Sequence, residues 1–236
     1  MKKLISTFCL VTLFSMVNAA EIQSDESLLG EAKATPSEPA KNTEKDATLL
    51  SSVLSNIMTF DANFEQNVYR ENSAQPEQSL GRFLIQRPNH FRWETKQPFE
   101  QSIIADGQAL WTYDPELEQV TIQDQQSVLA DSPLLLLTSS VDALVKAFEI
   151  VKIESREDEE QQLFALTPRE NGLFESVHIL IKNNTIKEFF LLDTLGGRTS
   201  VIFSEIRHNE RIDLNEFVFV PPEGIDIIDS REVTND

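Results

Sequence analysis

Basic residues are scarce in this chain of 236 residues: 20 Lys and Arg stand against 39 Asp and Glu, a formal net charge of −19. A protein this acidic repels phosphate backbones, and no window of the sequence concentrates basic residues, so nucleic-acid binding is excluded. There are 7 glycines and a single cysteine, which can form neither an internal disulfide nor a cysteine-rich zinc site. Hydrophobic residues make up 40% of the chain and include 15 Phe, as in a folded globular protein.

Residues 1–19 have the pattern of a cleaved secretory signal peptide. Lys2 and Lys3 precede an almost uncharged apolar stretch, and Val17-Asn18-Ala19 offers small residues to a signal peptidase. A membrane anchor is the alternative, but the apolar run is short for a bilayer. Cys9 lies inside that run, so it is not read as a lipidation site. Cleavage leaves 18 basic against 39 acidic residues, a net charge of −21, and no thiol, which excludes cysteine catalysis and suits an exported protein.

The composition divides the rest of the chain into three parts. Residues 20–47 are acidic, contain Pro36 and Pro39 and have no aromatic residue, which predicts a disordered tether. Residues 48–228 form the predicted folded domain, and residues 229–236 a polar C-terminal tail. The domain opens with apolar residues at helical spacing. Two further short helices are predicted, one after Ser132-Pro133 and one at 141–148.

Short segments of alternating hydrophobicity fill the domain between and after these helices. Asp106-Gly107 joins two of them and is the strongest hairpin signal in the chain. After the middle helices, strands are expected at Phe148–Ser155, Gln162–Leu166, Glu175–Ile181, Ile186–Leu192, Thr199–Ile206 and Phe217–Val220. About ten or eleven sequential strands predict one long antiparallel sheet that must curl to bury its apolar face. Such a sheet encloses either an apolar cavity or an ordinary filled core, and composition alone favours the filled core.

Three motifs give the chain a family resemblance. They are Gln86-Arg87-Pro88-Asn89-His90-Phe91-Arg92-Trp93-Glu94, the run Ile104–Pro115 with Asp106-Gly107 and Leu110-Trp111-Thr112-Tyr113-Asp114-Pro115, and Pro221-Pro222-Glu223-Gly224. In this order they closely resemble the LolA family of periplasmic lipoprotein carriers, over about Thr48 to Ile227. The resemblance implies a mainly β fold, an incomplete (open) antiparallel β-barrel covered by a helical lid, with a hydrophobic cavity between them.

The resemblance also implies a function and a set of partners. Family members accept acylated lipoproteins from an ABC-type releasing complex in the inner membrane of a Gram-negative bacterium. They cross the periplasm as soluble carriers and pass the cargo to LolB, a receptor in the outer membrane. The expected carrier is a monomer, needs no cofactor and inserts in no membrane. The alternative is a lipid or lipoprotein sensor or carrier of the same fold with a different cargo.

Arg87 is the first candidate site residue. Strand alternation places it on the same side as Phe83 and Ile85, where an unpaired guanidinium would be costly to bury. The resemblance implies that this arginine hydrogen-bonds the lid and holds the empty cavity shut. Without the resemblance, an arginine at a strand end would be read as solvated.

The other candidates line the cavity or belong to the lid. The resemblance places Phe91 near the cavity mouth, and Trp93 shares its face, although core packing explains Trp93 equally well. Alternation adds Phe64, Phe83, Ile85 and Ile103 as cavity candidates. The lid candidates are Leu50, Val53 and Leu54 of the first helix and Leu134, Leu135, Leu136 and Leu137 of the second.

Catalytic and metal sites are not expected. Carboxylate pairs such as Asp61 and Glu65 arise freely among 39 acidic residues. His90, His178 and His208 have no partner at metal-ligand spacing, and His178 is expected to be half-buried in a strand. No GxSxG motif is present.

Overall fold

A computed structural model describes residues 43–70, 73, 75–130, 141–153, 160–170, 172 and 174–231. The predicted signal peptide, most of the predicted tether and the predicted lid residues Leu134–Leu137 lie outside these residues.

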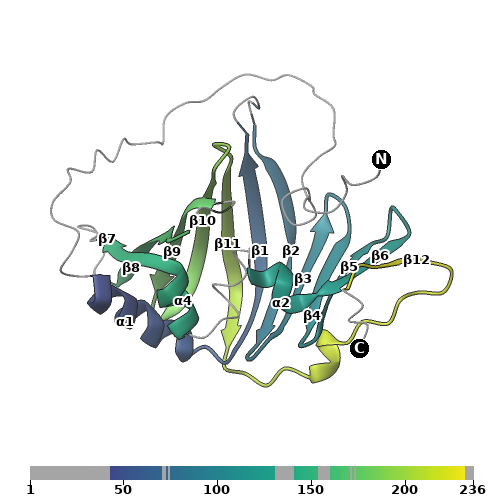
Figure 1. Cartoon of the computed structure of the whole chain (residues 1–236), viewed down its shortest axis with the longest axis horizontal. Helices are drawn as coiled ribbons and strands as arrows, with labels where there is room; N and C mark the ends of the chain where they lie inside the picture. The colour runs from purple at the N-terminus through teal and green to yellow at the C-terminus, as the bar shows by residue number, and fades with distance from the viewer. Residues whose placement is uncertain are drawn as a thin grey trace.

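The described chain forms one open sheet of twelve strands, where ten or eleven were expected. The strands are β1 (Thr59–Tyr69), β2 (Glu77–Gln86), β3 (His90–Gln97), β4 (Gln101–Asp106), β5 (Ala109–Asp114), β6 (Gln119–Asp124), β7 (Phe148–Ile153), β8 (Gln161–Pro168), β9 (Phe174–Lys182), β10 (Thr185–Asp193), β11 (Arg198–His208) and β12 (Asp226–Asp229). Their order in the sheet is β12-β6-β5-β4-β3-β2-β1-β11-β10-β9-β8-β7. Neighbours are antiparallel except for β12, which runs parallel to β6. Because β12 and β7 are edges and do not pair with each other, the sheet is curved but not closed (Figure 1). The predicted fold class is confirmed.

Local turn chemistry explains how successive strands pair. The hairpin at Asp106-Gly107 is confirmed: Gly107 has φ 98°, and the Asp106 carboxylate accepts hydrogen bonds from the backbone N–H groups of Gln108 and Ala109. Asn183 and Asn184, with φ 54° and 55°, form the tight turn between β9 and β10. Asparagine tolerates this left-handed region better than most residues, so the turn closes without glycine.

Three described helices pack on one face of the sheet, called here the inner face. They are α1 (Thr43–Ser55), α2 (Gln125–Ala130) and α4 (Val141–Ala147). Leu50 of α1, Val128 of α2 and Leu144 of α4 all join one hydrophobic cluster with the inner-face strand residues. In Figure 1, α1 and α4 lie together at the β7–β8 end of the sheet. None of the described helices combines the length and the apolar character needed to cross a bilayer.

Helix α1 also covers the edge strand β7. A carboxylate oxygen of Asp46 accepts a hydrogen bond of 2.9 Å from the backbone N–H of Lys152, a group that would otherwise face solvent at the sheet edge. The helix begins at Thr43, so residues 43–47, which the sequence assigned to the tether, belong to the folded domain. The reason is this contact with β7, which no local pattern reveals.

The C-terminal part of the domain packs against the other, outer face. The predicted strand at Phe217–Val220 is wrong: Leu214–Phe217 is a 3-10 helix, η1, capped by the Asp213 side chain, and no strand follows until β12. Phe217 is 1% exposed, and Phe219 packs on Trp111 and Tyr113. These aromatic residues alternate as they would in a strand, but each contacts the outer face separately. β12 includes Asp229, so the domain also extends one residue into the predicted tail.

Candidate functional site

The inner face carries a cluster of aromatic rings from four adjacent strands. Phe64 of β1 stacks on Trp93 of β3 with ring centroids 4.0 Å apart, and Phe83 of β2 lies 5.2 Å from Trp93. Phe203 of β11 lies 5.3 Å from Phe60 in an edge-to-face pair. These strands are neighbours in the sheet, so alternate residues along each one place the rings side by side. The result is a continuous apolar floor beneath the helices.

Helix α1 closes this floor from above. Leu50, Val53 and Leu54, the predicted lid residues of the first helix, are buried and pack in the same cluster as the floor. A small void remains, lined by Leu54, Ile57, Phe60, Phe83, Ile85, Arg87, Ile186 and Phe189. Its volume is about 10 Å³, roughly the space needed for one water molecule. The described residues around this void are closely packed, and we call this arrangement, with α1 against the floor, the closed form.

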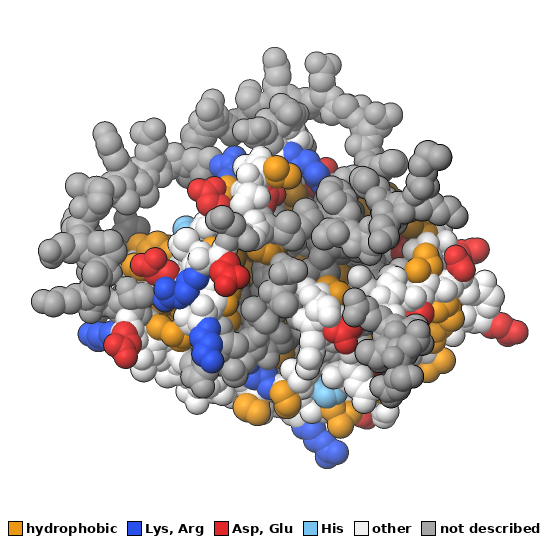
Figure 2. All heavy atoms as spheres, in the orientation of Figure 1, with side chains coloured by type: hydrophobic (Ala, Val, Ile, Leu, Met, Phe, Trp, Pro, Cys, Tyr) orange, Lys and Arg blue, Asp and Glu red, His pale blue; other side chains and the backbone are white. Residues whose placement is uncertain are grey.

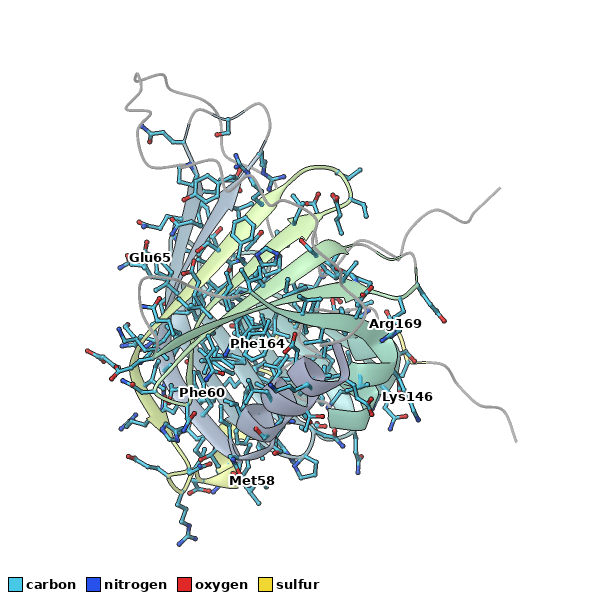
Figure 3. The ribbon with its side chains drawn as sticks, turned by 90° about the vertical axis from the view of Figure 1, so that its left-hand side faces the viewer. Met58, Phe60, Glu65, Lys146, Phe164 and Arg169 are labelled. Carbon is cyan, nitrogen blue, oxygen red and sulfur yellow. The ribbon has the colours of Figure 1, made fainter. Side chains whose placement is uncertain are left out.

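Figure 3 views the molecule from the β7–β8 end. Phe164 lies in the interior near the helices, whereas Glu65, Lys146 and Arg169 lie toward the outside. Phe164 is 0% exposed, so the apolar interior continues from the aromatic floor to β8.

Arg87 lies at the rim of the void and connects the end of β2 to the end of α1. Its Nε–H donates a hydrogen bond of 3.0 Å to the backbone carbonyl of Ile57, two residues after the helix. Its backbone N–H donates to the carbonyl of Met58 at 2.9 Å. Burial lowers the pKa of the Arg87 guanidinium from its ordinary value. A cation near the C-terminal end of a helix is favoured by the helix dipole, so this contact stabilises the end of α1 where the structure places it.

The structure gathers the remaining predicted cavity residues on the inner face. Phe83 and Ile85 line the void with Arg87, whereas Phe64, Phe91, Trp93 and Ile103 lie on the same face and pack in the surrounding cluster. Phe91 is 0% exposed and Trp93 is half-buried, so neither is at an open mouth in this closed form.

Four residues that line the void or its floor were missed by sequence reasoning. Ile57 and Phe60 flank the start of β1, and Phe60 follows the alternation of Ala62 and Phe64, a signal that could have found it. Ile186 and Phe189 are three residues apart, which strict alternation would place on opposite faces. A bulge between Ile186 and Glu188 turns both of them inward.

A second groove lies on the outer face and is polar. Its volume is about 210 Å³, and its walls include Asp61, Arg82, Arg207 and Glu216. Arg82 pairs with both carboxylate oxygens of Asp61 at 3.0 Å, and Arg207 bonds the same carboxylate. Burial raises the pKa of Asp61, but the hydrogen bonds and charge of the two arginines outweigh it and hold the pKa below its ordinary value. Because these charged groups pair with one another, we interpret the groove as a structural ion-pair network.

His178 is half-buried on the outer face of β9, as predicted. Its ring centroid lies 6.0 Å from that of Phe190, and burial lowers its pKa. Within the described part of the chain, no three His, Cys, Asp or Glu side chains are grouped closely enough to hold a metal ion.

Comparison with known proteins agrees with the motifs and the fold. The family model described as "Outer membrane lipoprotein carrier protein LolA" matches residues 55–220. An outer-membrane lipoprotein carrier protein of Chromohalobacter salexigens is 32% identical over 183 residues, which cover 77% of this chain and 86% of the relative. Proteins of the same name are 34% identical in Hahella chejuensis, over 76% of this chain and 86% of the relative, and 33% identical in Pseudomonas entomophila, over 85% and 96%. The chain therefore belongs to the LolA family of outer-membrane lipoprotein carrier proteins.

Proposed function

We propose that this protein is a periplasmic chaperone that binds the acyl chains of lipoproteins released from the inner membrane and carries them to a receptor in the outer membrane. The observation that carries the proposal is the apolar inner face beneath the helices, in a chain of the LolA family. The role requires no catalytic chemistry in the carrier itself.

The energetics of acyl chains explain why such a face is needed. Burying a methylene stabilises a lipid anchor by about 0.8 kcal/mol, so several acyl chains left in water would be unfavourable by tens of kcal/mol. A void of about 10 Å³ cannot hold one chain. In the proposed mechanism, loading separates α1 from the floor and exposes Phe60, Phe83 and their neighbours to the incoming chains.

Arg87 is the residue proposed to control this opening. Its hydrogen bond to the Ile57 carbonyl joins the floor to the end of α1 and is made in the closed form. A cargo that lifts α1 must break this bond, and re-forming it favours closure and release. This latch needs no energy source in the carrier itself. The energy for loading is proposed to come from an ABC-type complex in the inner membrane. The proposed acceptor of the cargo is a receptor of the LolB type.

Release of a lipoprotein from spheroplasts tests the function directly. Purified mature protein is added to spheroplasts that have newly synthesised an outer-membrane lipoprotein, and the supernatant is separated by size exclusion. The expected result is a soluble one-to-one complex that transfers its lipoprotein to outer-membrane vesicles. No release by folded protein would contradict the proposal and would favour a sensor or a carrier of another lipid.

The two tryptophans provide a test of where the acyl chains bind. Trp93 lies on the inner face, whereas Trp111 lies on the outer face, where its indole N–H donates to Asp106 at 2.7 Å. A lipopeptide with brominated acyl chains is expected to quench more than half of the fluorescence of the Trp111→Phe variant, which keeps Trp93. The Trp93→Phe variant, which keeps Trp111, is the matched control and is expected to lose little. Equal quenching of the two variants would place the chains elsewhere.

A further inference from the structure

The inner face is not apolar over its whole width. One cross-strand row runs Phe83, Trp93, Ile103, Thr112 and Thr121 from β2 to β6. Residues directly opposite each other in a sheet share a face, so this whole row lies on the inner face. The row is apolar as far as β4 and then presents two threonine hydroxyls.

The adjacent row changes in the same direction. It runs Phe64, Gly81, Thr95 and Gln101 from β1 to β4. The row therefore begins with Phe64, whose ring stacks on Trp93, and ends with the hydroxyl of Thr95 and the amide of Gln101. We call the four residues Thr95, Gln101, Thr112 and Thr121 the polar shelf. All four are half-buried, and Thr112 lies directly opposite the buried Ile103.

One atom of the polar shelf has an unmet hydrogen-bonding requirement. The side-chain oxygen of Gln101 is buried and has no hydrogen-bond partner among the described residues. Leaving a buried acceptor unpaired is unfavourable, and native proteins seldom do so without a reason. Thr121 accepts a long hydrogen bond of 3.4 Å from the Gln119 side chain and keeps its own O–H as a donor. The shelf thus offers a free acceptor and hydroxyl donors next to an apolar floor.

We propose that the polar shelf binds the peptide backbone that follows the acylated end of the cargo, so that the cargo lies with its acyl chains toward β1 and β2 and its peptide toward β4–β6. This inference rests on the proposed carrier function. The free oxygen of Gln101 needs a hydrogen-bond donor, which the glyceryl esters of a lipid anchor lack and the N–H groups of a peptide backbone provide. The threonine hydroxyls suit the carbonyl groups of the same backbone. In this orientation the acyl chains of the cargo lie on the apolar half of the inner face and its peptide lies on the polar half.

Two probes separate the shelf from the floor. One is a synthetic triacylated pentapeptide, and the other is a free fatty acid of the same chain length. The double variant Gln101→Leu/Thr112→Val keeps side-chain size but removes hydrogen-bonding groups. We expect it to bind the lipopeptide about tenfold more weakly than the wild type, since it loses one or two hydrogen bonds, and to bind the fatty acid within about twofold. Ser102→Val, next to Gln101 on the opposite face of β4, is the matched control and is expected to bind both probes as the wild type does.

The outcomes distinguish this inference from the carrier function. If the wild type binds neither probe, the proposed function fails and the shelf with it. If the wild type binds both and the double variant binds both equally well, the shelf inference is overturned while the carrier function stands. A double variant that loses affinity for both probes in proportion would also overturn it, because the effect would then lie in the floor. Thermal unfolding of each variant confirms that the comparison is made on folded protein.

Discussion

Arg87→Leu is expected to take up lipoprotein as the wild type does and to transfer it to the outer-membrane receptor about 10- to 100-fold more slowly. The guanidinium donates to the Ile57 carbonyl in the closed form, and in the proposed latch this bond breaks when α1 lifts from the floor. A hydrogen bond to a charged group contributes about 1.5–3 kcal/mol, and its loss removes that much from the closed form relative to the open one. When fewer molecules are in the closed form, the apparent affinity for cargo rises. Most of that rise appears as a lower rate of cargo release. The measurement is the rate at which preformed complexes deliver lipoprotein to outer-membrane vesicles.

Arg207→Leu is the control for this experiment. Arg207 is also an arginine of the sheet, but it lies on the outer face and pairs with Asp61. Its replacement is expected to leave both uptake and transfer close to those of the wild type. Transfer by Arg87→Leu at the wild-type rate would refute the latch, and equal slowing by both variants would show that any loss of arginine has the effect.

Much of the inner face could be predicted because strand alternation is a local signal. Phe83, Ile85 and Arg87 are alternate residues of the sequence, and the structure places all three at the void. The same reasoning identified Phe64 and Ile103 as inner-face residues, and the resemblance to the LolA family supplied the helical cover. These features depend on the two-residue period of a strand and on motifs that are continuous in sequence.

Other features depend on contacts between distant parts of the chain and could not be predicted locally. The bulge that turns Ile186 and Phe189 inward breaks the period, and only the pairing with β9 reveals it. Asp46 belongs to an ordered helix because it caps a backbone group of Lys152, 106 residues away. The residues from Phe217 to Phe219 have a strand-like pattern, but Phe217 ends a 3-10 helix, and Phe219 packs on the outer-face residues Trp111 and Tyr113.

The polar shelf illustrates a third limit. Thr95, Gln101, Thr112 and Thr121 come from four different strands. In the sequence, Thr95 and Gln101 have polar neighbours, whereas Thr112 and Thr121 have aromatic or aliphatic ones, so no shared local pattern marks the four residues. Their joint position becomes visible only from the registers of β3 with β4, β4 with β5 and β5 with β6. A division of the inner face into an apolar and a polar half is therefore a property of the assembled sheet.

Gly81→Ala is expected to destabilise the domain by about 3 kcal/mol, because the inner face has no room for even one methyl group at this position. A Cβ atom there would overlap the backbone carbonyl oxygen of Glu94 and would lie 2.5 Å from a ring carbon of Phe64. For a domain of this size the loss corresponds to a fall in melting temperature of roughly 6–12 °C, measurable by circular dichroism.

The same substitution is expected to disturb the floor as well as the stability. Phe64 lies over Gly81 and stacks on Trp93, so a methyl group at residue 81 must displace the phenyl ring or push β3 away. In a Trp111→Phe background, where Trp93 is the remaining tryptophan, the displacement is expected to shift the emission maximum of the Trp93 fluorescence.

Gly172→Ala is the matched control, since an added Cβ meets no atom within 4 Å, and its effect on the free energy of unfolding should stay within about 0.5 kcal/mol. If both variants melted at the same temperature, the close approach of Phe64 to the strand would not matter for stability. If Gly81→Ala melts lower and shifts Trp93 emission, the glycine is what lets an aromatic ring lie flat on β2, and the floor of the cavity depends on it.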